Sequence, residues 1–150
     1  MLFRSGEVSA GYAQRGYSDW RLRRLSGMTV DASLVWTATP LTTVSLRSST
    51  TLNETTVANS AGAVNRSMTL DISHALLRNL TIGAVGVFGV NEYKGVNIRE
   101  NTLSAGLKAE YKLNRSLSIR GSFTHERLNS TTPGSDYTAN VFLLGLKFQR

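Results

Sequence analysis

Apolar and polar residues alternate with a period of two along most of this chain. In the stretch 27–39, Val30, Leu34 and Trp36 share one phase, and the other phase is mostly polar. This pattern is typical of a β-strand that meets an apolar environment on one side only. The same alternation predicts strands over residues 5–17, 27–39, 42–53, 66–77, 80–93, 101–113, 117–127 and 137–149.

Three short connections recur along the chain at a nearly constant spacing. Each is followed by a leucine, and these leucines (Leu41, Leu80 and Leu117) are separated by 39 and 37 residues. A fixed period marks a repeated supersecondary unit, which here would be a long β-hairpin. The connections between the hairpins are longer and more polar, and they cover residues 18–26, 54–65, 94–100 and 128–136.

Short turns that alternate with long loops are typical of a membrane-spanning antiparallel barrel. The predicted strands are also long enough, because a tilted strand crosses a bilayer with about 9–11 residues, whereas strands of soluble proteins average about five or six. The predicted fold is therefore all-β. It is an antiparallel up-and-down transmembrane β-barrel of about eight strands, with three short periplasmic turns and four longer external loops. Residues 1–150 form one barrel domain, and both chain ends lie on the periplasmic side.

The composition agrees with a membrane barrel. Charged residues make up 18% of the chain, below the roughly one quarter that is usual in soluble domains. No run of about 18 apolar residues predicts a membrane helix, and no signal peptide precedes the first strand pattern. An exported protein needs such a signal, so we expect either that it was removed or, as we favour, that this chain is the C-terminal part of a longer barrel.

The strand phasing collects charged side chains on the face opposite the aliphatic one. A Lys or Arg on the lipid side at mid-membrane would cost about 2–4 kcal/mol, so we expect this face to line the lumen. Gly83 and Gly89 fall in the same phase, where a narrow lumen or a bulky neighbour would need space. A barrel of eight strands would be plugged by its own side chains, whereas a wider one would hold water. The predicted lumen-facing charged residues are Glu7, Asp31, Arg47, Asp71, Lys108, Glu110, Lys112, Arg120, Glu126 and Lys147.

Aromatic residues of the aliphatic phase lie near the predicted strand ends. Rings at this depth suit the interface between lipid headgroups and water. Tyr12, Trp36, Tyr111 and Phe148 are therefore the predicted membrane-interface aromatics. The alternative for Trp36 is an ordinary tryptophan of a protein core.

The sequence contains little that could support catalysis or cofactor binding. There is no cysteine, and His74 and His125 are the only histidines, so we predict no metal site. No Gly-x-Ser-x-Gly elbow and no phosphate-binding glycine loop occur. A histidine and a serine at the barrel rim could still form a hydrolase, with His125 as the candidate, but an interfacial histidine is the simpler interpretation. We expect no enzyme activity and no cofactor.

Several short segments resemble a known family. They are residues 6–12 (GEVSAGY), 31–37 (DASLVWT), 41–44 (LTTV), 77–80 (LRNL), 113–117 (LNRSL), and the ending 136–142 (DYTANVF) to 146–150 (LKFQR). Together they resemble the Gram-negative outer-membrane proteins grouped as beta-barrel porin type 2. Members are usually longer, with about twice this number of strands. The resemblance implies an outer-membrane location and a C-terminal half of such a barrel. One departure is that Phe148 is followed by Gln149 and Arg150, whereas outer-membrane strands often end on an aromatic residue.

Three functions follow as alternatives. The first is passive passage or export of a polar solute, with polysaccharide suggested by some relatives in the family. The second is a small plugged barrel with a structural or adhesive role. The third, a soluble basic barrel bound to nucleic acid, is suggested only by the net charge of +7. It would need aromatics interleaved with Lys and Arg on one face, whereas this chain separates aliphatic from charged residues, so we expect no nucleic acid.

The expected partners are outer-membrane lipid, the barrel assembly machinery and a polar solute.

The phase assignment predicts opposite outcomes for arginine on the two faces. Leu34→Arg or Leu107→Arg should block stable membrane insertion, because the charge would face lipid. Ser33→Arg or Ser104→Arg should be tolerated, because these side chains face away from lipid. Insertion can be measured as the fraction of protein that stays with extracted membranes. Equal effects in the two pairs would contradict the assignment.

Overall fold

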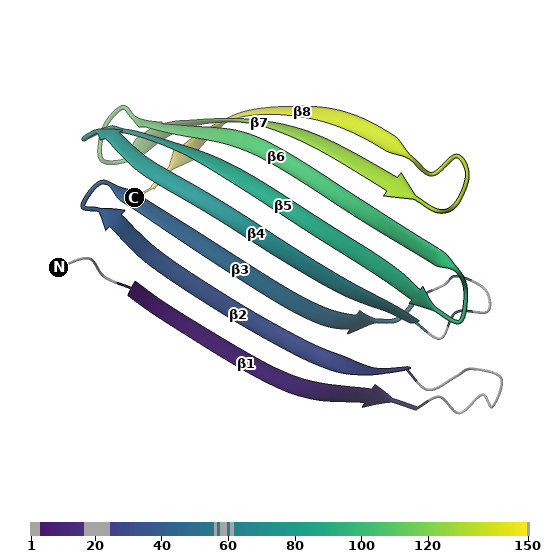
Figure 1. Ribbon diagram of the computed structural model, residues 1–150. Helices are drawn as coiled ribbons and strands as arrows, with labels where there is room; N and C mark the ends of the chain where they lie inside the picture. The colour runs from purple at the N-terminus through teal and green to yellow at the C-terminus, as the bar shows by residue number, and fades with distance from the viewer. Residues whose placement is uncertain (1–3, 17–24, 56, 58–59, 61, 150) are drawn as a thin grey trace.

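The described chain forms one antiparallel β-sheet whose strands lie in sequence order (Figure 1). The computed structural model describes residues 4–16, 25–55, 57, 60 and 62–149. Each strand is hydrogen-bonded to the next one along the chain. The strands are β1 (Arg4–Arg15), β2 (Leu25–Thr39), β3 (Thr42–Asn53), β4 (Gly62–Leu77), β5 (Leu80–Lys94), β6 (Ile98–Lys112), β7 (Leu117–Ser130) and β8 (Tyr137–Phe148).

The strands confirm the predicted all-β fold, and several of them continue further toward the long loops than the sequence pattern indicated. β4 begins at Gly62 rather than at residue 66, and β7 continues to Ser130 rather than ending at 127. The loop predicted over 94–100 covers only residues 95–97 in the structure, because Tyr93 and Ile98 still pair across the ladder. The alternation of residue types fades in these polar ends, while the backbone pairing persists. Most of the predicted loop 18–26 lies outside the described residues.

The three short turns are where the sequence placed them. Leu80 and Leu117 are the first residues of β5 and β7, as predicted. Leu41 lies in the turn itself, and β3 begins at Thr42, as the predicted strand 42–53 indicated. The hydroxyl of Thr39 accepts a hydrogen bond from the Leu41 backbone N–H at 3.2 Å and donates to Thr42 Oγ1 at 2.8 Å. This side-chain bonding closes a compact turn in which Leu41 is held outside the strand.

Each short turn also bonds to the strand beyond it. The backbone carbonyl of Leu41 accepts a hydrogen bond from Ala75 N–H at 2.8 Å. The carbonyls of Asn79 and Ser116 accept equivalent bonds, both at 2.8 Å, from Lys112 and Gln149. The same cross-hairpin bond therefore occurs at all three turns, which is the structural counterpart of the repeat in the sequence. It ties each hairpin to the next one at the short-turn end.

The sheet is curved and open, with β1 and β8 at its two edges (Figure 1). β1 begins and β8 ends at the short-turn end, since Arg4 pairs with Trp36 and Leu117 with Phe148. Few side chains are buried: Leu52 and Val64 form a small apolar cluster near the long loops. Most side chains thus project from one of the two faces of the sheet, and the candidate site lies on these faces.

Candidate functional site

The strand register sorts the side chains onto two faces. Directly paired residues of an antiparallel ladder point to the same side of the sheet. Glu7 pairs with Ser33, and Ser33 pairs with Arg47. We call the side that these three residues share the polar face. Leu34 and Leu46, which also pair, define the apolar face on the other side. Every later strand can be assigned to these two faces by the same pairing.

The polar face carries all ten charged residues that the sequence predicted to point away from lipid. The pairings place Asp71 opposite Ser45, Glu110 opposite Arg120, and Ser118 opposite Lys147. The structure brings these charges together in four local groups, each described below.

The first group is an ion pair that crosses a whole strand. Lys108 of β6 donates to the carboxylate of Asp71 on β4, and β5 lies between the two. The lysine chain passes over Gly83, its direct partner on β5. A Cβ on Gly83 would lie 2.7 Å from Lys108 Cε and 2.7 Å from the carbonyl oxygen of Ile72. The bulky neighbour predicted for Gly83 is therefore Lys108, whereas a Cβ on Gly89 would make only an ordinary contact, 3.7 Å from Thr102 Cβ.

The second group surrounds Glu110 at the short-turn end of β6–β8. Arg120 Nη2 lies 3.1 Å from Glu110 Oε2, and Ser118 Oγ donates to Glu110 Oε1 at 3.2 Å. These residues line an open concavity of about 780 Å³ together with Lys112 and Lys147. Arg115 of the turn lines the same concavity. The group contains more bases than acids, so this mouth of the polar face is basic.

The third group lies on β1–β3. Glu7, Asp31 and Arg47 share an open concavity of about 420 Å³ with several serines. Among the residues that the structure describes, none of the three makes an ion pair within 4 Å. Their charges remain available to water or to a solute.

The fourth group is near the long loops, where the hydroxyl of Tyr137 on β8 donates to the carboxylate of Glu126 on β7. Asn91, Tyr93 and Glu100 form a similar polar group at the same end of β5 and β6, with Tyr93 Oη donating to Glu100 Oε2 at 3.2 Å. On β4–β8, hydrogen-bonded polar groups therefore occur at both strand ends and in the middle of the polar face.

The predicted charges are unevenly distributed across the sheet. On β1–β4 the acids Glu7, Asp31 and Asp71 accompany one base, Arg47. On β6–β8 four bases accompany two acids. One wall of the polar face is therefore net acidic and the other net basic. The acids of the second wall are Glu110, Glu126 and Glu100, which was not among the predicted charges, and its bases are Lys108, Lys112, Arg120 and Lys147.

The apolar face exposes large hydrophobic side chains over its whole central region. Leu107 is 63% exposed, Phe142 is 76% exposed and Leu144 is 84% exposed. A continuous surface of this kind marks contact with a membrane or another apolar partner. The aromatics lie at its ends: Trp36, Tyr111 and Phe148 near the short turns, and Tyr12 toward the opposite end of β1. Their place at membrane interfaces remains a prediction.

Both histidines lie on the apolar face and bond to polar neighbours. His74 Nδ1 and Thr42 Oγ1 are 2.8 Å apart, and His125 Nδ1 and Asn140 Oδ1 are 2.7 Å apart. No serine hydroxyl takes part in either pair. Within the described part of the chain, no group of three or more His, Cys, Asp or Glu residues could hold a metal ion. The described residues also form no helix that could cross a membrane.

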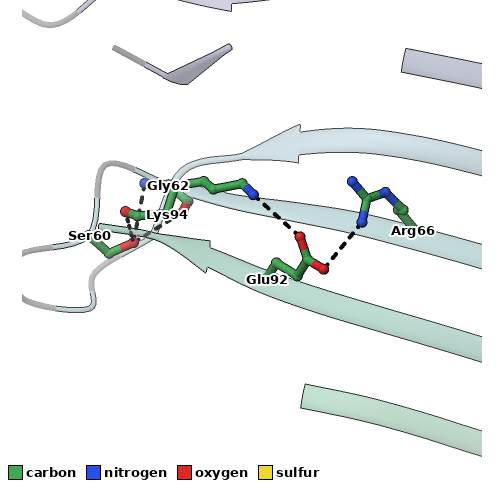
Figure 2. A network of polar contacts seen from close by, with 5 residues as sticks. All are labelled: Ser60, Gly62, Arg66, Glu92 and Lys94. Atoms are coloured by element: carbon green, nitrogen blue, oxygen red, sulfur yellow. Dashed lines mark hydrogen bonds and ion pairs between the residues drawn. The ribbon is translucent and has the colours of Figure 1, made fainter. Parts of the chain in front are cut away.

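A charged network that the sequence pattern did not predict lies on the apolar face at the long-loop end (Figure 2). Glu92 of β5 lies between Arg66 Nη1 and Lys94 Nζ, with N–O distances of 3.3 Å to each. Beside it, the Ser60 hydroxyl donates to the carbonyls of Gly62 and Lys94, at 3.1 Å each. The sequence did contain a sign of this network, namely charged residues at aliphatic-phase positions near the strand ends. Such residues mark where the apolar environment ends.

Comparison with known proteins agrees with this architecture. The family model described as "Putative beta-barrel porin 2" matches residues 3–150. The chain belongs to this family. No curated protein matches it.

A solved outer-membrane barrel shares the fold of this porin-family chain. The structure is described as "OmpT (in-vitro folded), an outer membrane protein Vibrio cholerae (trimer form)". It matches with a TM-score of 0.71 at 11% sequence identity, over 99% of this chain and 48% of that protein. The chain therefore spans about half the length of the barrel that it resembles. Its strands are those of an antiparallel transmembrane barrel, and its curved sheet has the shape of part of such a wall.

The Lys108–Asp71 bridge gives a sharp test of the polar face. Gly83→Ala should destabilise the protein by about 1–3 kcal/mol, because the new methyl group would overlap Lys108 and the Ile72 carbonyl. Gly86→Ala is the matched control, since a Cβ at Gly86 meets nothing within 4 Å. Urea unfolding of the purified protein in detergent would measure both variants. Equal stability of the two would show that Lys108 does not need this space.

Proposed function

We propose that the chain forms part of an outer-membrane porin of a Gram-negative bacterium, which lets polar solutes cross passively. The observation that carries this proposal is that the same strands carry a largely apolar, exposed face on one side of the sheet and a charged face on the other. In a barrel wall, the first face would meet lipid and the second would meet water. We propose no enzyme activity for this chain.

The proposed barrel is wider than eight strands. In lipid, unpaired backbone groups cost several kcal/mol each, so the free edges of β1 and β8 need partners. The eight-stranded sheet is open, and the similar barrel has about twice this length. Further strands, from the same protein or from another copy, would close it. Such a barrel leaves an aqueous channel, whereas a closed eight-stranded barrel would be filled by its side chains.

The proposed orientation follows from the lengths of the connections. The short turns would face the periplasm and the long loops the exterior. The barrel assembly machinery and outer-membrane lipid are then the partners that insertion requires. Polysaccharide is one candidate solute, because the polar face offers many hydroxyl, amide and charged groups for hydrogen bonding.

Planar-bilayer recordings of the purified protein test the channel. We expect large, steady conductance steps if the polar face lines a water-filled lumen. Conductance near zero from correctly inserted protein would instead support the plugged barrel with a structural or adhesive role. Reversible block of the current by an added polysaccharide, and none by a small sugar, would assign the larger solute.

Ion selectivity tests whether the basic mouth near the short turns lies in the conducting path. Lys147→Gln should lower the permeability ratio of chloride to potassium by a factor of a few, since a unit charge at about 4 Å in water is worth about 1 kcal/mol. Glu110→Gln should shift the ratio in the opposite direction. Lys94→Gln removes the same charge from the apolar face and should leave the ratio unchanged. An equal shift with the Lys94 variant would argue against a lumen on the polar face.

A further inference from the structure

Four bases and one acid gather on the apolar face where the strands approach the long loops. We call Arg66, Glu92, Lys94, Arg99 and Arg127 the loop-end basic cluster. In β4–β8, whose residues are all described, every Lys, Arg, Asp and Glu of the apolar phase belongs to this cluster. The rest of that face in β4–β8 is aliphatic, aromatic or uncharged. On these five strands, charge thus appears on the apolar face only at the long-loop end.

The position of the cluster relative to the apolar side chains is defined by the register. Met68 pairs with Phe88, Phe88 with Leu103, and Leu103 with Arg127. Arg127 therefore stands in the same row as three large exposed hydrophobic side chains. Arg99 precedes Leu103 by four positions in β6 and so lies about 13 Å closer to the long-loop end, at 3.3 Å per residue. The cluster begins where the apolar surface ends.

The charges of the cluster do not cancel. Glu92 bonds to Arg66 and Lys94 at 3.3 Å each, and Arg99 pairs with Glu92 across the ladder (Figure 2 shows the first three). The single carboxylate of Glu92 is thus shared among several basic side chains. Among the described residues, neither Arg99 nor Arg127 makes an ion pair within 4 Å, although Arg127 Nε donates to Asn129 Oδ1 at 3.2 Å. The outward-facing guanidinium groups remain available to an anion.

We propose that the loop-end basic cluster binds the phosphate groups of membrane lipid headgroups, with the lipid acyl chains lying on the adjoining apolar face. Guanidinium groups match phosphate oxygens with two parallel hydrogen bonds. A lipid offers both required parts in one molecule, a phosphate for the arginines and an acyl chain for Phe88 and Leu103. This inference rests on the proposed function in one respect, namely that the apolar face meets lipid.

Lipid binding by the purified protein in a nonionic detergent tests the proposal. The probes are phosphatidic acid and a diacylglycerol with the same acyl chains but no phosphate, with native mass spectrometry as the readout. Phosphatidic acid should bind more tightly. Since each base near a membrane surface contributes about 1 kcal/mol, the double variant Arg99→Gln/Arg127→Gln should weaken its binding about 30-fold. The control Arg47→Gln/Lys112→Gln removes two charges from the polar face and should change binding less than about twofold.

A second variant gives an effect of opposite sign. Glu92→Gln removes the only acid of the cluster and should tighten phosphatidic acid binding several-fold, because Arg66 and Lys94 lose their carboxylate partner. If Glu92 served only to hold the strands together, the same variant would weaken binding or leave it unchanged. That outcome would count against the proposal even if the arginine variants misfolded.

Other results would overturn the inference. Equal binding of diacylglycerol and phosphatidic acid would exclude phosphate recognition. Competition by inorganic phosphate at the concentration at which the lipid binds would indicate a site for free phosphate instead. If the protein bound the lipid through its arginines but showed no conductance, that result would contradict the proposed channel and not the lipid site. Normal conductance with unchanged lipid binding in Arg99→Gln/Arg127→Gln would contradict the lipid site alone.

Discussion

Hydrogen bonding between neighbouring strands is the interaction on which the rest of this structure depends. Each strand pairs with the next one in the sequence, and the ladder continues into polar ends such as residues 62–65 and 128–130. A membrane offers no water to backbone groups, so a spanning sheet must satisfy them internally. The cross-hairpin bonds at the three short turns extend this rule to the turn carbonyls of Leu41, Asn79 and Ser116. A small buried core is sufficient because the ladder holds the sheet together.

The ladder also explains why the two faces differ so sharply. Once the register is set, each residue faces the same side as its direct partner, and a shift of one position would exchange the faces. Charges on the polar face can then meet across strands, as Lys108 and Asp71 do over Gly83. Surface ion pairs contribute little stability in water, and the role that we propose for these charges is to line a channel. The uneven division of charge between β1–β4 and β6–β8 would give that lining an acidic and a basic wall.

Much of the fold could be predicted because its signal is local. The alternation around Leu34 identifies a strand and a face without knowledge of any distant residue, and the repeat at Leu80 and Leu117 identifies the hairpins. The strand ends were harder to predict, because polar residues such as Asn65 and Asn129 suit a loop and a ladder equally. Arg66 and Glu92 were missed for a related reason. Their charge contradicts the phase of their strands, and only the paired neighbours show that they form one network.

The sequence by itself determined the number of strands, the positions of the turns and the face of nearly every residue, since all three follow from a period of two and short-range turn chemistry. Only the tertiary structure decided which charges meet. Lys108 and Asp71 are 37 residues apart and belong to strands that are not adjacent. Their contact depends on the register of two ladders and on the missing side chain of Gly83. The grouping of Arg66, Glu92 and Lys94 has the same origin, because it depends on β4 and β5 remaining paired beyond the apolar surface.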